Sequence, residues 1–501
     1  MMGFPLPVLH WHERCIAALA RLPRRRAAFR GALSCSPTHC RLAVPTGGRR
    51  IGKQAALTAS QPRDQPAAAE TGDSPAAAKT ASGGGIVRGA IAFVAQLGPG
   101  LITGAADDDP TAIATYAQAG ASFRYGLLWT CLLTYPMMAT VQYIAAKVAL
   151  VHGKGLAGVI GERYPRGLLY AAVLGLTFAN VVNAGADLGA IAAAINLIVP
   201  IPRALLIVPV AVFLLAFLAF GSYHLIEDTF KWLTLALLAY VISAFLAHPD
   251  YGAMLKGTFV PHISLGAAFL TLLVATLGGN VSPYLFFWEA DLEVSEEASQ
   301  RPVRAHRLRL AANLKDLAWD TNVGMIFSNI IIFFIEVASA ATLPKLGMTN
   351  VTSAAAAARA LRPVLGSGAT YLWAVGMIGS GLLAVPALTG SVADAVSSTF
   401  GWPHGIEDRP SRAVRFYLVL AVALGIGAAI DYVGINPMRA LVLAGALNGL
   451  LTPPLLVLLL LIANRRDVMG DHTNGLGLNI LGWATTAIMA AAAIVLLWTV
   501  L

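Results

Sequence analysis

The sequence predicts an all-α polytopic membrane protein with about eleven transmembrane helices, arranged as an inverted repeat of five plus five. Three observations support this fold class. Hydrophobic residues make up 57% of the 501-residue chain and charged residues only 12%, against about 25% charged residues in soluble domains. Apolar stretches of helical length follow one another from residue 86 onward. The first and the sixth stretch are each interrupted at a proline, and breaks in matching positions are typical of inverted repeats.

Residues 1–85 precede the apolar stretches and are predicted to form a disordered basic tail. They are rich in Arg, Ala, Pro, Ser and Gly, with no sustained apolar period. Thirteen of the 35 Lys and Arg residues lie within residues 1–88, so the net charge of +9 reflects the tail rather than a nucleic-acid-binding surface. Three of the four cysteines also lie there, so no disulfide framework is indicated. An over-long start of the reading frame explains the segment equally well.

Residues 86–501 are predicted to form the transmembrane domain. Repeat one would occupy about 88–248, repeat two about 264–463, and an extra helix 476–500. Most of the apolar stretches reach the roughly 17–25 residues that a membrane span requires. The expected spans are 90–118, 126–150, 167–199, 204–221, 230–248, 264–294, 320–343, 369–399, 412–430, 436–463 and 476–500.

The loops between the spans carry an uneven share of positive charge. With the N-terminus in the cytoplasm, fourteen Lys and Arg residues fall in inner loops and seven in outer loops. Cytoplasmic loops are enriched in these residues, so the N-terminus is expected inside. After eleven spans the C-terminus is then expected in the periplasm of a multi-pass protein of the bacterial inner membrane.

The first span contains three consecutive carboxylates, Asp107, Asp108 and Asp109, followed by Pro110. Asp109 lies 11 residues after Gly98, about 16 Å at helical rise and roughly half of the hydrocarbon core. A carboxylate at that depth is costly unless it is paired, protonated or hydrated, and Pro110 breaks the helix there. Such a break is typical of an ion site in a transporter. Asp109 is the expected inward group, with Asp107 or Asp108 lining the access path; the alternative is that Asp109 only caps a new helix.

The sixth span is the second expected break. Gly278 and Gly279 loosen the backbone, and Pro283 cannot donate the helical hydrogen bond. Glu289 and Asp291 follow this break and could line a cytoplasmic vestibule, where a solvated acid is the favoured interpretation. Because five is an odd number, a second repeat would enter the membrane from the opposite side, so its first span would match this one.

Two other intramembrane polar groups are candidates. Asn180, Asn183 and Asp187 in the third span share one helix face. Asp187 is either a proton or ion relay or a hydrogen-bonded packing acid. Asn448 in the tenth span either faces the site or satisfies backbone groups that the nearby Pro453 frees.

The motifs around the first break resemble those of the Nramp divalent-metal transporters. The similarity rests on Gly98-Pro-Gly100, the Asp109-Pro110 pair, Gln118-Ala-Gly-Ala121, Ala186-Asp187-Leu188, the break before Pro283, Leu388-Thr-Gly390 and the segment Asn464–Gly470. The resemblance implies a LeuT-type fold with eleven or twelve helices, alternating access, and usually proton-coupled uptake of manganese or ferrous iron.

Residue by residue, the resemblance retains one side-chain ligand of three. The family aspartate falls on Asp109, whereas its asparagine falls on Ala112. Its methionine falls on Ser282, its histidine on Tyr284 and its carbonyl ligand on Gly279. A glutamine of the tenth span falls on Gly445, one turn before Asn448. The expected metal site is therefore Asp109, Gly279 and Ser282 with Asp108 and Asn280, and the expected relay is Asp187, Tyr284 and Asn448.

The change of ligands points to a hard cargo ion. Thioether sulfur favours soft metals, whereas carboxylate, hydroxyl and water favour magnesium, calcium or manganese. Magnesium keeps several waters, for which Ala112 and Ser282 leave room, and family members that carry magnesium likewise lack the methionine. The expected cargo is Mg²⁺ or Mn²⁺, with Fe²⁺ next. Loss of the histidine leaves proton coupling open.

The predicted function is therefore secondary transport of a divalent cation, with no separate cofactor. The expected partners are this ion and the lipid bilayer, with no nucleic acid and no obligate protein partner. The main alternative keeps the fold and carries an organic amine or amino acid, with the Asp cluster as counter-ion. An enzyme is not expected, because no nucleophile–base or nucleotide motif is present.

Overall fold

The computed structural model describes residues 99–221, 223–300, 306–351, 368–406, 408, 410–434 and 436–500. The predicted tail at 1–85 and the start of the predicted first span lie outside the described residues. Every regular element within the described ranges is a helix, which confirms the all-α prediction.

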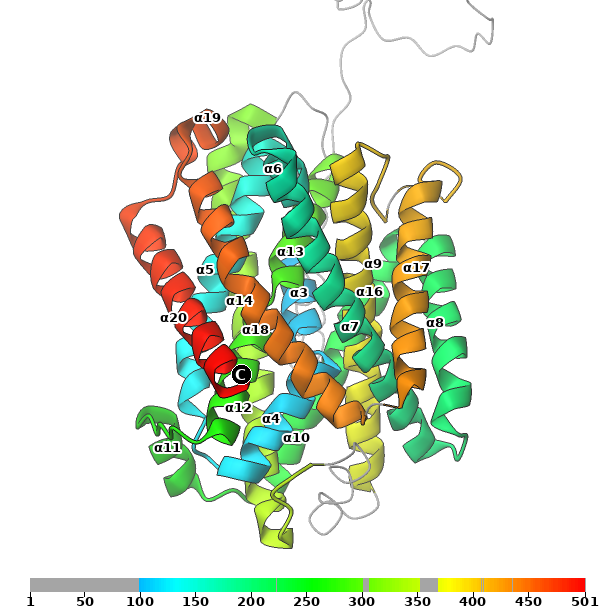
Figure 1. The fold of residues 1–501 in the computed structure, drawn as a ribbon, viewed down its shortest axis with the longest axis vertical. Helices are drawn as coiled ribbons and strands as arrows, with labels where there is room; N and C mark the ends of the chain where they lie inside the picture. Colours follow the sequence, from blue (N-terminus) through cyan, green and yellow to red (C-terminus); the bar gives the residue numbers. More distant parts are fainter. Residues whose placement is uncertain are drawn as a thin grey trace, which may run out of the picture. The chain divides into compact units, whose positions relative to one another are not determined.

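The helices follow the order of the predicted spans (Figure 1). Short 3-10 turns η1, η2 and η3 occupy Pro344–Leu346, Asp431–Val433 and Gly470–His472. The α-helices are α3 Pro99–Asp107, α4 Pro110–Phe123, α5 Trp129–His152, α6 Leu156–Arg163, α7 Arg166–Ile198, α8 Arg203–Phe220, α9 Tyr223–Ala236, α10 Leu238–Leu246, α11 Tyr251–Phe259, α12 Ala267–Asn280, α13 Pro283–Gln300, α14 His306–Thr342, α16 Gly368–Phe400, α17 Val414–Ile430, α18 Pro437–Ala463, α19 Arg466–Met469 and α20 Leu476–Val500.

The described part of the chain contains eight helical stretches long and apolar enough to cross a membrane. Two further helix pairs, bent by 66° and 119°, would raise that number to ten. The predicted first span begins before the described residues, so the total of eleven stays a prediction. The apolar helices nevertheless make this a multi-pass membrane protein by length and composition.

Both predicted helix breaks are present. α3 ends at Asp107 and α4 begins at Pro110, while α12 ends at Asn280 and α13 begins at Pro283. In each case a proline is the first residue of the second half-helix, where its missing N–H has no helical partner to lose. In Figure 1, α3 and α13 lie in the middle of the bundle, with α7 and α16 to their right and α5 and α20 to their left.

The half-helix α3 is held along its length by α14. A Cβ added at Gly104 would fall on the backbone of Gly324, and one added at Gly324 would fall on the carbonyl of Gly100. Only glycine permits backbones to approach this closely. The Gly100 N–H also donates to Asp320 Oδ2 at 2.7 Å. These contacts fix α3, and with it the acids at its C-terminal end, against α14.

Candidate ion-binding site

Asp109 occupies the gap between α3 and α4 and is only 3% exposed. Its backbone is extended, and its Oδ1 accepts from the Ala112 N–H at 2.6 Å, so Asp109 does cap α4. Its other oxygen, Oδ2, accepts from Asn183 Nδ2 at 3.0 Å and lies 3.5 Å from the Tyr284 hydroxyl. The capping interpretation is thus confirmed, and Oδ2 is left to face two other helices.

A polar network on α7 supports this carboxylate. The Thr111 hydroxyl lies 2.5 Å from Asn183 Oδ1 and 3.0 Å from Asp187 Oδ1. Asp187 Oδ2 has no hydrogen-bond partner among the described residues. Asn180, one turn before Asn183, donates to the Leu388 carbonyl of α16 at 3.3 Å. Asp187 therefore joins the Asp109 network through Thr111 and keeps one oxygen available.

The second break lies opposite Asp109. The Ser282 hydroxyl donates to the Gly279 carbonyl at 2.5 Å, and the Tyr284 hydroxyl donates to the Ala106 carbonyl of α3 at 2.9 Å. A Cβ added at Gly279 would meet no atom within 4 Å. Tyr284 thus joins the two breaks directly, and open space lies beside the Gly279 backbone.

Asn280 and Asn448 lie at the edges of the same region. Asn280 Nδ2 donates to the Tyr116 hydroxyl of α4 at 2.7 Å. The Oδ1 atoms of Asn280 and Asn448 are buried without a partner in the described ranges. The Thr452 hydroxyl lies 2.8 Å from the Val281 carbonyl, which ties α18 to the second break. This contact brings α18 to the second break.

Gly445 lies where α18 meets both half-helices. A Cβ there would lie 3.3 Å from the Ala275 carbonyl of α12, 3.5 Å from Thr111 Cγ2 and 3.7 Å from Thr115 Oγ1. A side chain longer than glycine at this position would therefore project between α4 and α12.

Asp107 and Asp108 face away from Asp109. Both carboxylates contact the Ser328 hydroxyl of α14, at 2.8 Å to Asp107 Oδ2 and 3.0 Å to Asp108 Oδ1. Both are almost completely buried. The structure therefore does not place either acid on an exposed access path, and it separates Asp108 from the other predicted ligands.

Two cavities occupy regions on either side of the site. A largely apolar cavity of about 850 Å³ lies between α4, α12, α18 and α20, with Gln118, Ser122 and Arg439 on its wall. A polar cavity of about 780 Å³ lies between α6, α13 and α16, with Asp291 and Asp394 on its wall. Glu289 is fully buried, 3.5 Å from Thr321 Oγ1. The prediction of a solvated acid at Glu289 is therefore wrong, because α5 packs along α13 and Thr321 of α14 contacts the Glu289 carboxylate.

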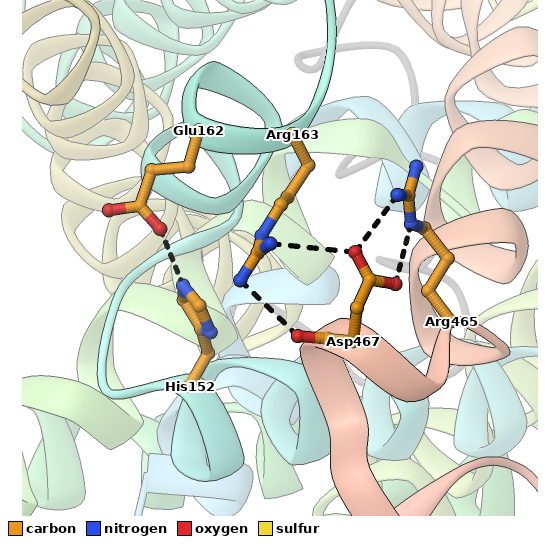
Figure 2. A network of polar contacts seen from close by, with 5 residues as sticks. All are labelled: His152, Glu162, Arg163, Arg465 and Asp467. Carbon is orange, nitrogen blue, oxygen red and sulfur yellow. Dashed lines mark hydrogen bonds and ion pairs between the residues drawn. The ribbon is translucent and has the colours of Figure 1, made fainter. Parts of the chain in front are cut away.

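A surface network joins α6 to α19 at the end of the bundle (Figure 2). Asp467 accepts hydrogen bonds from Arg465 Nε at 3.0 Å and from Arg465 Nη2 at 2.9 Å. Arg163 Nη1 lies 3.4 Å from Asp467 Oδ2. The Arg465 guanidinium lowers the pKa of Asp467. His152 and Glu162 form a neighbouring pair at 2.8 Å. These contacts tie the loop after α5 to the segment after α18.

The atoms around the first break that could bind a metal ion are oxygens. Within the described ranges, no group of three or more His, Cys, Asp or Glu side chains is arranged to hold a metal ion. A cation there would instead combine the Asp109 carboxylate with carbonyl, hydroxyl and amide oxygens. That donor set suits hard ions such as magnesium, calcium or manganese.

Two contributors to this region had no sequence signal of their own. Thr111 is an ordinary threonine in the first turn after a proline, and Ser328 lies in an apolar span more than 200 residues away. Only the tertiary packing of α4 on α7 and of α3 on α14 brings them to the acids. Asn183 did carry a signal, because it shares a helix face with Asp187.

The chain is similar to known proteins in sequence and in fold. Residues 100–499 match the family model described as natural resistance-associated macrophage protein-like, abbreviated Nramp. The chain is 28% identical over 453 residues to the divalent metal cation transporter MntH of Deinococcus radiodurans, covering 88% of this chain and 98% of that protein.

Solved structures show the same fold. A manganese transporter of Eremococcus coleocola superposes with a TM-score of 0.66 at 19% identity, covering 84% of this chain and 89% of that one. Mhp1, a nucleobase-cation-symport-1 family transporter, superposes with a TM-score of 0.54 at 17% identity, covering 81% and 91%. The fold is therefore of the LeuT type, as the family resemblance implies.

Proposed function

The chain belongs to the Nramp family of divalent metal cation transporters, and we propose from this premise that it moves a hard divalent ion, Mg²⁺ or Mn²⁺, by alternating access through the break at Asp109. It is a transporter and not an enzyme. The observation that carries the proposed ion class is the donor set at the two breaks, which consists of oxygens.

Asp109 is the proposed central ligand. Among the described residues, its Oδ2 lies near the Asn183 amide at 3.0 Å and the Tyr284 hydroxyl at 3.5 Å. The Gly279 carbonyl and Ser282 hydroxyl are the proposed ligands from the second break, and Asn280 Oδ1 is a further oxygen beside it. Because Ser282 stands in place of a sulfur ligand, soft ions gain no special advantage at this site.

Mn²⁺ has support from the relatives as well as from the ligands. The Eremococcus protein is a manganese transporter, and manganese accepts oxygen ligands. Mg²⁺ rests on the ligand chemistry alone, because it prefers to keep several waters and open space lies beside Gly279.

Proton coupling is a separate part of the proposal. Asp187 contacts Thr111, whose neighbour Asn183 donates to Asp109. An acid in this position is suited to accept a proton when the ion arrives. We therefore place the relay on Asp187, with Tyr284 in place of the family histidine.

The test is ion flux into liposomes that contain the purified full-length protein. Mg²⁺, Mn²⁺, Fe²⁺ and Cd²⁺ are offered separately, with internal pH recorded by a trapped dye, and protein-free liposomes serve as the control. The proposal expects Mg²⁺ or Mn²⁺ flux that exceeds Cd²⁺ flux. Uptake of none of the four ions would contradict it and favour an organic solute. Acidification that accompanies metal entry and disappears in Asp187→Asn would support the relay.

Orientation and the tail complete the proposal. We place the protein in the bacterial inner membrane with the N-terminus in the cytoplasm, because basic residues are twice as frequent in the predicted inner loops. A reporter fused after Leu501 should then be periplasmic. Deletion of residues 1–85 should leave insertion and transport intact; loss of insertion would show that the tail is needed.

A further inference from the structure

The three consecutive acids face two different surroundings. Asp109 turns to Asn183 of α7 and Tyr284 of α13, whereas Asp107 and Asp108 turn to Ser328 of α14. Successive helical residues point about 100° apart, and the break at Asp109 adds a further turn of the chain. The acids therefore cannot all ligate one ion.

The contacts of Ser328 leave the Asp107–Asp108 pair short of positive charge. A serine hydroxyl has a single hydrogen, yet its oxygen lies within hydrogen-bond distance of both carboxylates. It can satisfy one of them fully at a time. Two buried carboxylates with one shared hydrogen repel each other unless one of them is protonated or a cation lies between them.

Unpartnered oxygens surround the pair. Asp107 Oδ1 and Asp108 Oδ2 have no hydrogen-bond partner in the described part of the chain, and neither have the hydroxyls of Thr103 and Tyr240. All four side chains are at most 2% exposed. Thr103 lies four residues before Asp107 and shares its helix face. Tyr240 belongs to α10, which packs on α14, the helix that carries Ser328.

We propose that Asp107 and Asp108, with the hydroxyls of Thr103, Ser328 and Tyr240, form a second cation site that holds a hard divalent ion apart from the Asp109 site. Two carboxylates match the charge of one divalent ion, and hydroxyl oxygens are further ligands for magnesium or manganese. The identity of the ion rests on the proposed function. The location rests on the contacts above, and the glycine contacts of α3 with α14 hold the ligands from the two helices together.

The test counts the ions that the full-length protein binds in lipid nanodiscs. Mn²⁺ is titrated by calorimetry, and unbound Mn²⁺ is counted by electron paramagnetic resonance. The wild type should bind two equivalents. Asp109→Asn should keep the second-site equivalent, and the double variant Asp107→Asn/Asp108→Asn should keep the Asp109 equivalent with its affinity changed less than about threefold.

Ser328→Ala keeps both carboxylates, so it tests the site even if the double variant misfolds. It should weaken one equivalent by about tenfold, the loss of one hydroxyl ligand. Ser380→Ala is the matched control, because Ser380 is equally buried and its hydroxyl donates, in the part of the chain that the structure describes, to the Met377 carbonyl of its own helix. It should leave both equivalents unchanged.

The outcomes separate this inference from the proposed function. A single equivalent that Asp109→Asn removes and the double variant leaves intact would overturn the second site alone. Two equivalents that persist in the double variant would also overturn it. No binding by the wild type would overturn the proposed function and the second site together.

Discussion

Replacement of Asp109 by asparagine is the most direct test of the proposed site. Asparagine keeps the size of the side chain and an oxygen that can cap α4 through the Ala112 N–H, which lies 2.6 Å from Oδ1. It removes the one carboxylate that faces both breaks. Losing one partner of a buried charged contact costs about 3–5 kcal/mol. Since each 1.4 kcal/mol is tenfold, Mn²⁺ should bind the Asp109 site between about 100-fold and about 4,000-fold more weakly.

The matched control is Asp250→Asn. Asp250 caps α11 in the same way, accepting from the Ala253 N–H three residues later at 3.0 Å, but it lies outside the site. Calorimetry in nanodiscs should show weaker Mn²⁺ binding in Asp109→Asn and unchanged binding in Asp250→Asn. Size-exclusion chromatography should show that both variants are folded. Full retention of every binding equivalent and its affinity in Asp109→Asn would refute the reasoning and move the site to another acid.

Three further outcomes follow from the geometry. Gly324→Ala places a methyl group on the α3 backbone, so overpacking of about 1–3 kcal/mol should lower the melting temperature in detergent, whereas Gly425→Ala, with no atom within 4 Å of its Cβ, should not. The neighbouring guanidinium lowers the pKa of Asp467, so the ion pair stabilises above the unfolded pKa of about 3.9 and is lost as pH falls through the lower folded value. Asp467→Asn should therefore melt below the wild type at pH 5–7, and the difference should shrink as the pH falls below the unfolded pKa; a pH-independent difference would contradict this. Ser282→Met adds a sulfur ligand and should raise the affinity for Cd²⁺ relative to Mn²⁺ in calorimetry, while tight Cd²⁺ binding by the wild type would refute the hard-ion argument.

The sequence predicts the broken helices well because their causes are local. Pro110 and Pro283 each lack the N–H that a continuing helix needs, so the breaks do not depend on what packs around them. The same holds for Asp109, whose place before Pro110 makes it the cap of α4. The residue pattern within one membrane span is therefore enough to locate these residues to within one position.

The surroundings of the acids cannot be predicted in this way. The contacts of Ser328 with Asp107 and Asp108 join residues more than 200 positions apart, and they depend on which face of α3 meets α14. The prediction for Glu289 is wrong for a related reason. Its position near the predicted inner membrane surface suggests solvent, but α5 packs along α13 and Thr321 of α14 contacts the carboxylate, so Glu289 is buried. Which face of a helix meets which neighbour depends on the packing of the whole bundle, and no short motif encodes that packing.

The Asp109 carboxylate both caps α4 and, as proposed above, binds the ion. Its Oδ1 closes the first turn of α4, so an ion that draws on this oxygen competes with the Ala112 N–H. Ion occupancy and the order of that turn are then linked equilibria, and linkage is reciprocal. Whatever loosens the start of α4 changes the affinity for the ion, and the ion changes the stability of α4 by the same factor. In thermodynamic terms, the ion acts as an effector of the first turn of α4.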